Sequence, residues 1–315
     1  MTVQNLKNPS LVYGLGVRSP FSTYTLVAEE SELLAWLEEH QLRSYLPFEE
    51  ALVSSVELSE RTVSGEVLIT VSGAQRLFVN GRSRITLDLQ GSPVEDIDVS
   101  VVALDVRADT DIIIDAEPSR RSAHLIYASV AEGAVLRIND LIISEHDSFR
   151  RVVVSLDDSA SVYPNHAFLL SGEGRLDLKS DVTHIGRDSF SDMKMRGVLA
   201  GSSQVIVQGD VTIKPTAFDA NGYQQEDLIL ASPRAIARPI PNLEIGNNEV
   251  KCSHGATVSS VDPEQVFYLR SRGLSEEDAK GLLLSSFVEP ILDLFAASDH
   301  DRIRSKMRGI IDASR

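Results

Sequence analysis

The sequence predicts a mainly β protein whose central region folds as a parallel β-helix. Between residues 51 and 260, short β-branched runs such as Val67–Val71 and Arg151–Ser155 follow one another, and Gly, Asp, Asn and Ser mark the breaks, as at Asn80–Gly81. A β-sandwich usually ends within about 100 residues, so this region needs either two sandwiches or a solenoid whose coils bury their faces against each other. The strand lengths and the aliphatic stacks favour the β-helix.

The residues on either side of this region predict helices. Residues 1–50 contain one helical candidate, Ser31–Glu39, and Pro47 prevents its continuation. Residues 261–315 predict three helices, the first starting at Asp262. The other signals are an end of the first helix at Gly273, a second start at Ser275 with Asp278, a kink at Pro290, and a third start at Ser298 with Asp301. We therefore expect an N-terminal helical or irregular region (1–50), a β-helix core (51–260) and a C-terminal helical region (261–315).

The composition limits the functional classes. The net charge is −16, and such a surface repels phosphate backbones, so we expect no nucleic-acid partner. The chain has one cysteine, which rules out an internal disulfide and fits a reducing compartment. No apolar run reaches the roughly 18 residues of a membrane span, and the first residues lack the apolar core of a signal peptide. We expect a cytoplasmic protein that binds no membrane.

Catalytic signatures are absent from the sequence. There is no Walker A pattern, no G-x-S-x-G and no H-E-x-x-H. Gly14–Gly16 is a lone G-x-G, which indicates a turn rather than a dinucleotide site. We therefore expect that the chain is not itself an enzyme.

Cys252 and His254 form the strongest candidate site. Residues two apart on a strand face the same way, so a thiolate and an imidazole would lie side by side and suit soft-metal or sulfur chemistry. Structural zinc and iron–sulfur centres usually take four ligands. Either another chain completes the site, or it is not a metal site. A nucleophile–base pair and a packed structural cysteine remain alternatives.

A second polar cluster runs from Asp181 to Asp192 around His184. Its carboxylates could bind a hard cation, but aspartates that cap the turns of a solenoid explain the pattern better. The other histidines lack ligand-like neighbours in the sequence, and we interpret them as structural or surface residues: His40, His124, His146, His166 and His300.

Two stretches resemble the SufB/SufD family, the scaffold subunits of SUF iron–sulfur cluster assembly. The first, residues 243–292, reads LEIGNNEVKCSHGATVSSVDPEQVFYLRSRGLSEEDAKGLLLSSFVEPIL, and it resembles the family's C-terminal signature. The second, residues 181–215, reads DVTHIGRDSFSDMKMRGVLAGSSQVIVQGDVTIKP. The resemblance implies a right-handed parallel β-helix core, pairing of two such subunits through their β-helices, and C-terminal helices that dock a SufC-like ABC ATPase.

The resemblance also implies roles for particular residues. Cys252 and His254 fall on the Cys-x-His pair of SufD-like members, which lies at the subunit interface and is implicated in cluster formation. Ser253 and Gly255 stand where SufB-like members carry glutamates, so the motif is SufD-like. The segment that precedes the ATPase-docking part of the family is matched by Phe267, Tyr268, Arg270, Arg272 and Gly273.

The length of 315 residues resembles minimal SUF systems, in which one SufB/SufD-like protein pairs with itself. A homodimer would bring two copies of Cys252 and His254 together around a transient iron–sulfur cluster. Two alternatives stay open: a SufD-type partner of a separate SufB scaffold with no cluster of its own, and a β-helix carbohydrate-active enzyme. An adaptor for the ATPase with an inert Cys252 is a further variant of the scaffold.

Overall fold

The computed structural model describes residues 39, 58–94, 96–293, 295 and 297–313. The predicted helix Ser31–Glu39 lies outside these residues except for Glu39, which is helical. The strands are β1 (Leu58–Val71), β2 (Ala74–Leu89), β3 (Ser92–Val94), β4 (Ile97–Val106), β5 (Thr110–Ala116), β6 (Ser122–Val130), β7 (Val135–Ser144), β8 (Ser148–Leu156), β9 (Ser161–Leu170), β10 (Arg175–His184), β11 (Phe190–Leu199), β12 (Gln204–Ile213), β13 (Asn221–Leu230), β14 (Ile236–Ile245) and β15 (Lys251–Ser260).

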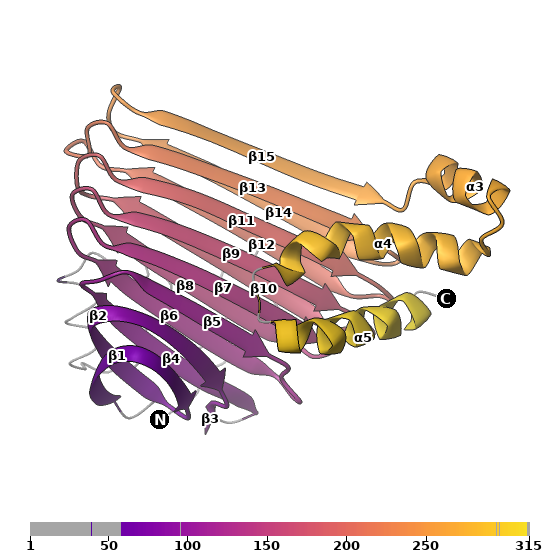
Figure 1. Ribbon diagram of the computed structural model, residues 1–315, viewed down its shortest axis with the longest axis horizontal. Helices are drawn as coiled ribbons and strands as arrows, with labels where there is room; N and C mark the ends of the chain where they lie inside the picture. Colours follow the sequence, from indigo (N-terminus) through magenta and orange to yellow (C-terminus); the bar gives the residue numbers. More distant parts are fainter. Residues whose placement is uncertain (1–38, 40–57, 95, 294, 296, 314–315) are drawn as a thin grey trace, which may run out of the picture.

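These strands form one continuous sheet that winds into a solenoid (Figure 1). The even-numbered strands from β4 to β14 stack in parallel on one side, and the odd-numbered strands from β5 to β15 stack in parallel on the other. Each coil contributes one strand to each side. The prediction of a mainly β protein with a parallel β-helix core is confirmed.

Strand β2 connects the two sides. Its residues 74–79 pair with β4, and its residues 83–87 pair with β5. Asn80–Gly81, which predicts a break, therefore lies inside a strand, at the corner where the chain passes from one side to the other. The Asn-Gly signal marks a real change of direction: the pairing of β2 with β1 shifts register here, passing from Val79 to Ser83.

The core fills the interior of the solenoid, the lumen. Alternate residues point inward, as along β12, where Val205, Val207 and Val211 are buried in the main hydrophobic cluster. The sequence has two β-branched runs here, Gln204–Val207 and Asp210–Ile213, and both belong to this one strand because Gly209 continues the ladder between them. Close packing of aliphatic side chains from successive coils stabilises the stack.

The chain after β15 forms three helices, α3 (Pro263–Ser271), α4 (Glu276–Leu292) and α5 (Ala297–Ala313). Asp262 caps α3 by accepting a hydrogen bond from the Glu264 N–H at 2.9 Å, and Gly273 follows the helix with φ +99°. Ser275 Oγ accepts from the Asp278 N–H at 3.0 Å at the start of α4. Helix α4 runs through Pro290. The first two predicted starts are therefore found with their caps, whereas α5 begins at Ala297, one residue before the predicted start at Ser298.

Helices α4 and α5 lie against the outer face of the odd-numbered strands (Figure 1). Leu284 and Ile303 are buried against Leu169 and Val198 of β9 and β11. Arg302 also forms ion pairs with Asp115 and Glu117 at the end of β5. No helix within the described residues is long and apolar enough to cross a membrane.

Candidate functional site

Cys252 and His254 lie on β15, the last strand of the solenoid. They are in register with Gly222 and Gln224 of β13, and both point toward the lumen. Cys252 is partly buried and packs against the main core cluster, whereas His254 is exposed. The structure therefore places the two residues side by side, at the open end of the lumen.

The Cys252 thiol lies in a setting that disfavours the thiolate. Burial raises the pKa of Cys252, and the nearby backbone of Gly222 offsets part of that rise. A metal ion or a positive partner group must supply the free energy for deprotonation. Among the described residues, no three His, Cys, Asp or Glu side chains stand close enough to hold a metal ion. The described chain by itself gives Cys252 and His254 no third ligand.

Among the described strands, β15 is the last of its stack, so one of its backbone edges has no neighbouring strand. The Lys251 N–H donates to the Ala220 carbonyl of the preceding coil at 3.1 Å, so odd-numbered residues of β15 bond to β13. Backbone groups alternate in direction along a parallel strand. The N–H and C=O groups of Cys252, His254 and Ala256 therefore point away from the solenoid.

The edge of β14 is different because of two prolines. Ile236 and Gly246 donate their N–H groups to Ser203 and Ile213 on the β12 side, so the odd-numbered residues of β14 face outward. Pro239 and Pro241 occupy two of these outward positions and have no N–H to donate. Proline at such positions blocks the addition of another strand. Of the two strands of the last coil, β15 alone keeps its full row of outward donors.

A second candidate surface lies on α3 and α4. Phe267, Tyr268 and Leu282 are 74%, 56% and 50% exposed. A groove of about 500 Å³ separates the two helices, and its lining includes Leu269, Leu283 and the acidic Asp262 and Glu264. An apolar groove with exposed aromatic side chains is typical of a protein-binding surface.

The predicted docking residues take different positions around this groove. Tyr268 lines it directly, and the Arg272 guanidinium lies 5.3 Å from the centre of the Tyr268 ring. Arg270 forms an ion pair with Glu276 at 3.4 Å and is held beside the start of α4. Gly273 provides the turn between the helices.

Glu226 is one of the buried acids that the sequence pattern does not predict. Glu226 on β13 is fully buried, points into the lumen, and is in register with Ala256 on β15. A side chain at Gly209 would come within 3.0 Å of the Glu226 carboxyl, so the glycine makes the space that this acid occupies. Burial raises the pKa of Glu226 to about 8, and backbone N–H groups at Gly209 and Ile240 offset part of the rise. A polar run (Gln224–Asp227) in the sequence indicates an exposed strand, and only the coil geometry reveals the burial.

The Asp181–Asp192 cluster is structural. His184 is fully buried, and its ring nitrogens bond Ser189 Oγ at 2.8 Å and Ser191 Oγ at 2.9 Å. Asp181 forms an ion pair with Arg151, and Asp192 forms one with Lys194. Asp188 adopts φ +54° in the turn between β10 and β11. Asp188 alone lies in a turn, as the interpretation of turn-capping aspartates expects, whereas Asp181 and Asp192 lie on β10 and β11 and form ion pairs.

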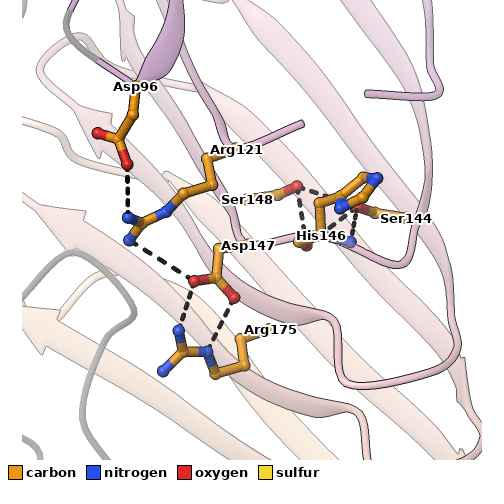
Figure 2. Close-up of polar contacts among 7 residues, drawn as sticks. All are labelled: Asp96, Arg121, Ser144, His146, Asp147, Ser148 and Arg175. Carbon is orange, nitrogen blue, oxygen red and sulfur yellow. Dashed lines mark hydrogen bonds and ion pairs between the residues drawn. The ribbon is translucent and has the colours of Figure 1, made fainter. Parts of the chain in front are cut away.

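A ladder of charged side chains joins successive turns at one end of the coils (Figure 2). Asp147 accepts from Arg175 Nε at 2.8 Å and lies 3.6 Å from Arg121, which also bonds Asp96 at 2.9 Å. In the same view, His146 donates its backbone N–H to Ser144 Oγ at 3.0 Å. The carboxylates and guanidinium groups neutralise one another, so the ladder ties turns together.

The fold and the candidate site define a class: a parallel β-solenoid with a Cys-x-His pair on its last strand and an exposed apolar groove beside two C-terminal helices. A family model described as "SUF system FeS cluster assembly, SufBD core domain" matches residues 68–287. The chain belongs to the SufB/SufD family of iron–sulfur cluster assembly proteins, and the resemblance found in the sequence is confirmed.

Curated relatives agree with this assignment. The chain is 33% identical over 147 residues to the SufBD family protein slr0074 of Synechocystis, covering 45% of this chain and 31% of that protein. It is 33% identical over 141 residues to the chloroplastic protein ABCI7 of Arabidopsis thaliana, covering 44% and 30%. It is 32% identical over 96 residues to SufD of Escherichia coli, covering 30% and 23%. The chain therefore spans less than a third of the length of these relatives.

Proposed function

We propose that this protein is a non-catalytic scaffold of a SUF-type assembly complex. Two copies pair through β15, a SufC-like ABC ATPase docks on α3 and α4, and a nascent iron–sulfur cluster forms at the interface with Cys252 and His254 as ligands. Membership of the SufB/SufD family supports the assembly role. ATP hydrolysis belongs to the partner, because the sequence carries no Walker A pattern.

The contrast between the two terminal edges carries the pairing proposal. The edge of β15 offers outward N–H and C=O groups at Cys252 and His254, whereas Pro239 and Pro241 interrupt the edge of β14. An exposed edge with its donors intact is a template for another strand. A second copy fits best, because two-fold symmetry pairs an edge with itself.

A two-fold axis at Ser253 would assemble a ligand set. Antiparallel pairing about this axis places Cys252 of one protomer opposite His254 of its partner, and the reverse. Directly opposite side chains have Cβ atoms about 5 Å apart and point to the same face. Two thiols and two imidazoles would then gather on the lumen side, which is enough for four ligands.

A disulfide placed on the axis tests this function. In a Cys252→Ser background, Ser253→Cys should form an intermolecular disulfide, because opposite residues at a non-hydrogen-bonded position lie about 4.5 Å apart between Cα atoms. Thiol-blocked, non-reducing electrophoresis measures the linked dimer. Thr257→Cys in the same background is the control, since its two copies would lie roughly 27 Å apart. Equal cross-linking of both variants, or of neither, would contradict the axis.

Docking of the ATPase rests on the groove between α3 and α4. Exposed aromatic and leucine side chains, with an apolar groove beside them, support a protein partner at this place. The proposed pairing strand β15 and the proposed docking helix α3 are joined only by residues 261–262. Movement of an ATPase docked on α3 would therefore be transmitted to the edge of β15 through this short connection.

A specific observation favours one alternative, the SufD-type partner of a separate scaffold. Ser253 and Gly255 flank His254 at the two positions where SufB-like members carry glutamates. The chain is also similar to SufD of Escherichia coli. In that case the β15 edge would bind the edge of a SufB homologue, and the Ser253→Cys disulfide would require a matching cysteine there. Membership of the SufB/SufD family disfavours the carbohydrate-active alternative. The cytoplasmic location stays a prediction.

A further inference from the structure

A closed group of polar side chains interrupts the aliphatic lumen; we name it the polar cell. It consists of His124, Asp140, Arg150, His166 and Ser180, each at most 4% exposed. His124 and Arg150 are register neighbours on β6 and β8, and Asp140 and His166 are register neighbours on β7 and β9. The two pairs come from opposite sides of the solenoid and meet across the lumen.

Part of the polar cell is fully hydrogen-bonded. His166 Nδ1 lies 3.1 Å from Asp140 Oδ2, and His166 Nε2 lies 3.0 Å from Ser180 Oγ. The order Ser-His-Asp is that of a hydrolase triad. Ser180 is 0% exposed, however, so no substrate reaches its hydroxyl. The triad geometry is structural.

The other part presents polar atoms without protein partners. Within the described chain, Asp140 Oδ1, His124 Nδ1, and Nε and Nη1 of Arg150 are buried and make no hydrogen bond. Arg150 Nε is 3.4 Å from Asp140 Oδ2, which is an ion pair without a well-aligned hydrogen bond. Buried donors and acceptors are almost always satisfied in native proteins, so these atoms point to a bound group.

The charges of the cell identify the class of that group. The Asp140 carboxylate balances the Arg150 guanidinium, and burial, then the charge of Arg150, lowers the pKa of His124 well below its ordinary value. An anion would find no net positive charge, and the guanidinium repels a cation. The bound group must accept a hydrogen bond from Arg150 and donate one to Asp140. A neutral molecule that is both donor and acceptor can do this. We propose that the polar cell binds at least one ordered water molecule that bridges Arg150, Asp140 and His124.

The bound water gives the cell a role in coil register. A slip of two residues would keep aliphatic side chains inside the lumen, because the inward period is two. The same slip would separate Arg150 from Asp140 and leave both charges buried and unpaired, which is far more costly than an aliphatic mismatch. The hydrated cell therefore fixes the alignment of the middle coils.

A crystal structure of the full chain at about 1.8 Å resolution tests the proposal directly. We expect a density peak within about 3.2 Å of both Arg150 Nη1 and Asp140 Oδ1. Two variants give an independent readout. His124→Leu should lower the melting temperature by about 3–6 °C, because it removes a partner of the water, while His124→Asn should stay close to the wild type. An empty cell in the density, or a His124→Leu variant at least as stable as the wild type, overturns the proposal.

Discussion

Cys252 is the residue on which the proposed chemistry depends. Its raised pKa and its partial burial mean that the thiol ionises only when a metal ion or a positive partner group stabilises the thiolate. The sequence predicted the pairing of Cys252 with His254 on one face, because residues two apart on a strand face the same way. It did not predict Glu226 in the lumen below them, because burial of that carboxyl depends on the shape of the neighbouring coil.

Replacement of the thiol tests its role as a ligand. Cys252→Ser should abolish most of the iron and sulfide bound to the anaerobically purified complex, because serine offers no soft thiolate. Iron and sulfide assays with visible absorbance make the measurement, and circular dichroism checks that the solenoid is intact. An unchanged cluster content in a folded variant would remove Cys252 from the ligand set.

Glu226 predicts a pH dependence of stability. Its folded pKa of about 8 lies above the ordinary glutamate pKa of 4.5, so the unfolded chain releases this proton first as the pH rises. The contribution is fully present below pH 4.5 and is lost progressively up to about pH 8. At about 1.4 kcal/mol per unit, the loss is about 4–5 kcal/mol.

Glu226→Gln removes the titrating carboxyl group and keeps the size and shape of the side chain. The unfolding free energy of this variant relative to the wild type should therefore rise between pH 5 and pH 8, as measured by chemical denaturation at several pH values. Glu173→Gln, at an exposed position in the turn before β10, is the matched control and should leave the profile unchanged. A parallel pH profile for Glu226→Gln and the wild type would show that the acid is not buried as described.

At the scale of elements, the two edge strands of the last coil differ in one chemical respect. Every outward position of β15 keeps its N–H, whereas β14 carries proline at two of its outward positions. Helix α4 begins at its predicted capping residue and α5 begins one residue before its own. The place of both helices on the odd-numbered strands depends on the apolar outer face that β9 and β11 build together. Local signals define elements, and their contacts require the assembled stack.

A pair of proline substitutions distinguishes the edges. Ala256→Pro removes one outward N–H of β15 and should weaken self-association at least tenfold, because two hydrogen bonds are lost across a two-fold interface. Ala237→Pro removes an outward N–H of β14 and should leave association unchanged. Analytical ultracentrifugation over a concentration series gives both dissociation constants. If Ala237→Pro weakened self-association more than Ala256→Pro did, the interface would lie on β14 rather than on β15.

At the scale of the whole molecule, the two candidate surfaces lie together at the C-terminal end of the stack of coils. The open edge of β15 and the groove between α3 and α4 are adjacent along the chain, while α4 and α5 anchor the helical region to the stack. This arrangement connects the two proposed partners, a second copy and an ATPase, through one short segment of chain. The division of the chain at residues 50 and 260 stays a prediction.

Loss of the exposed apolar side chains should release the ATPase. Tyr268→Ala combined with Leu282→Ala should weaken binding of the SufC-like ATPase by about 10- to 100-fold, since exposed aromatic anchors contribute most to such interfaces. Leu68→Ala is the matched control, because Leu68 is 67% exposed on β1 at the other end of the solenoid. Calorimetric titration with the purified ATPase measures the affinities, and equal binding by all variants would exclude this groove.

The sequence by itself determined the class of the fold, the starts of the C-terminal helices and the family, because these depend on local period, capping and motif. It also placed Cys252 and His254 on one face. Only the tertiary structure decided which edge stays open, that Glu226 is buried, and that His124, Arg150 and Asp140 meet. The period of two indicates whether a side chain points inward, but the length of each coil determines which inward side chains face each other across the lumen.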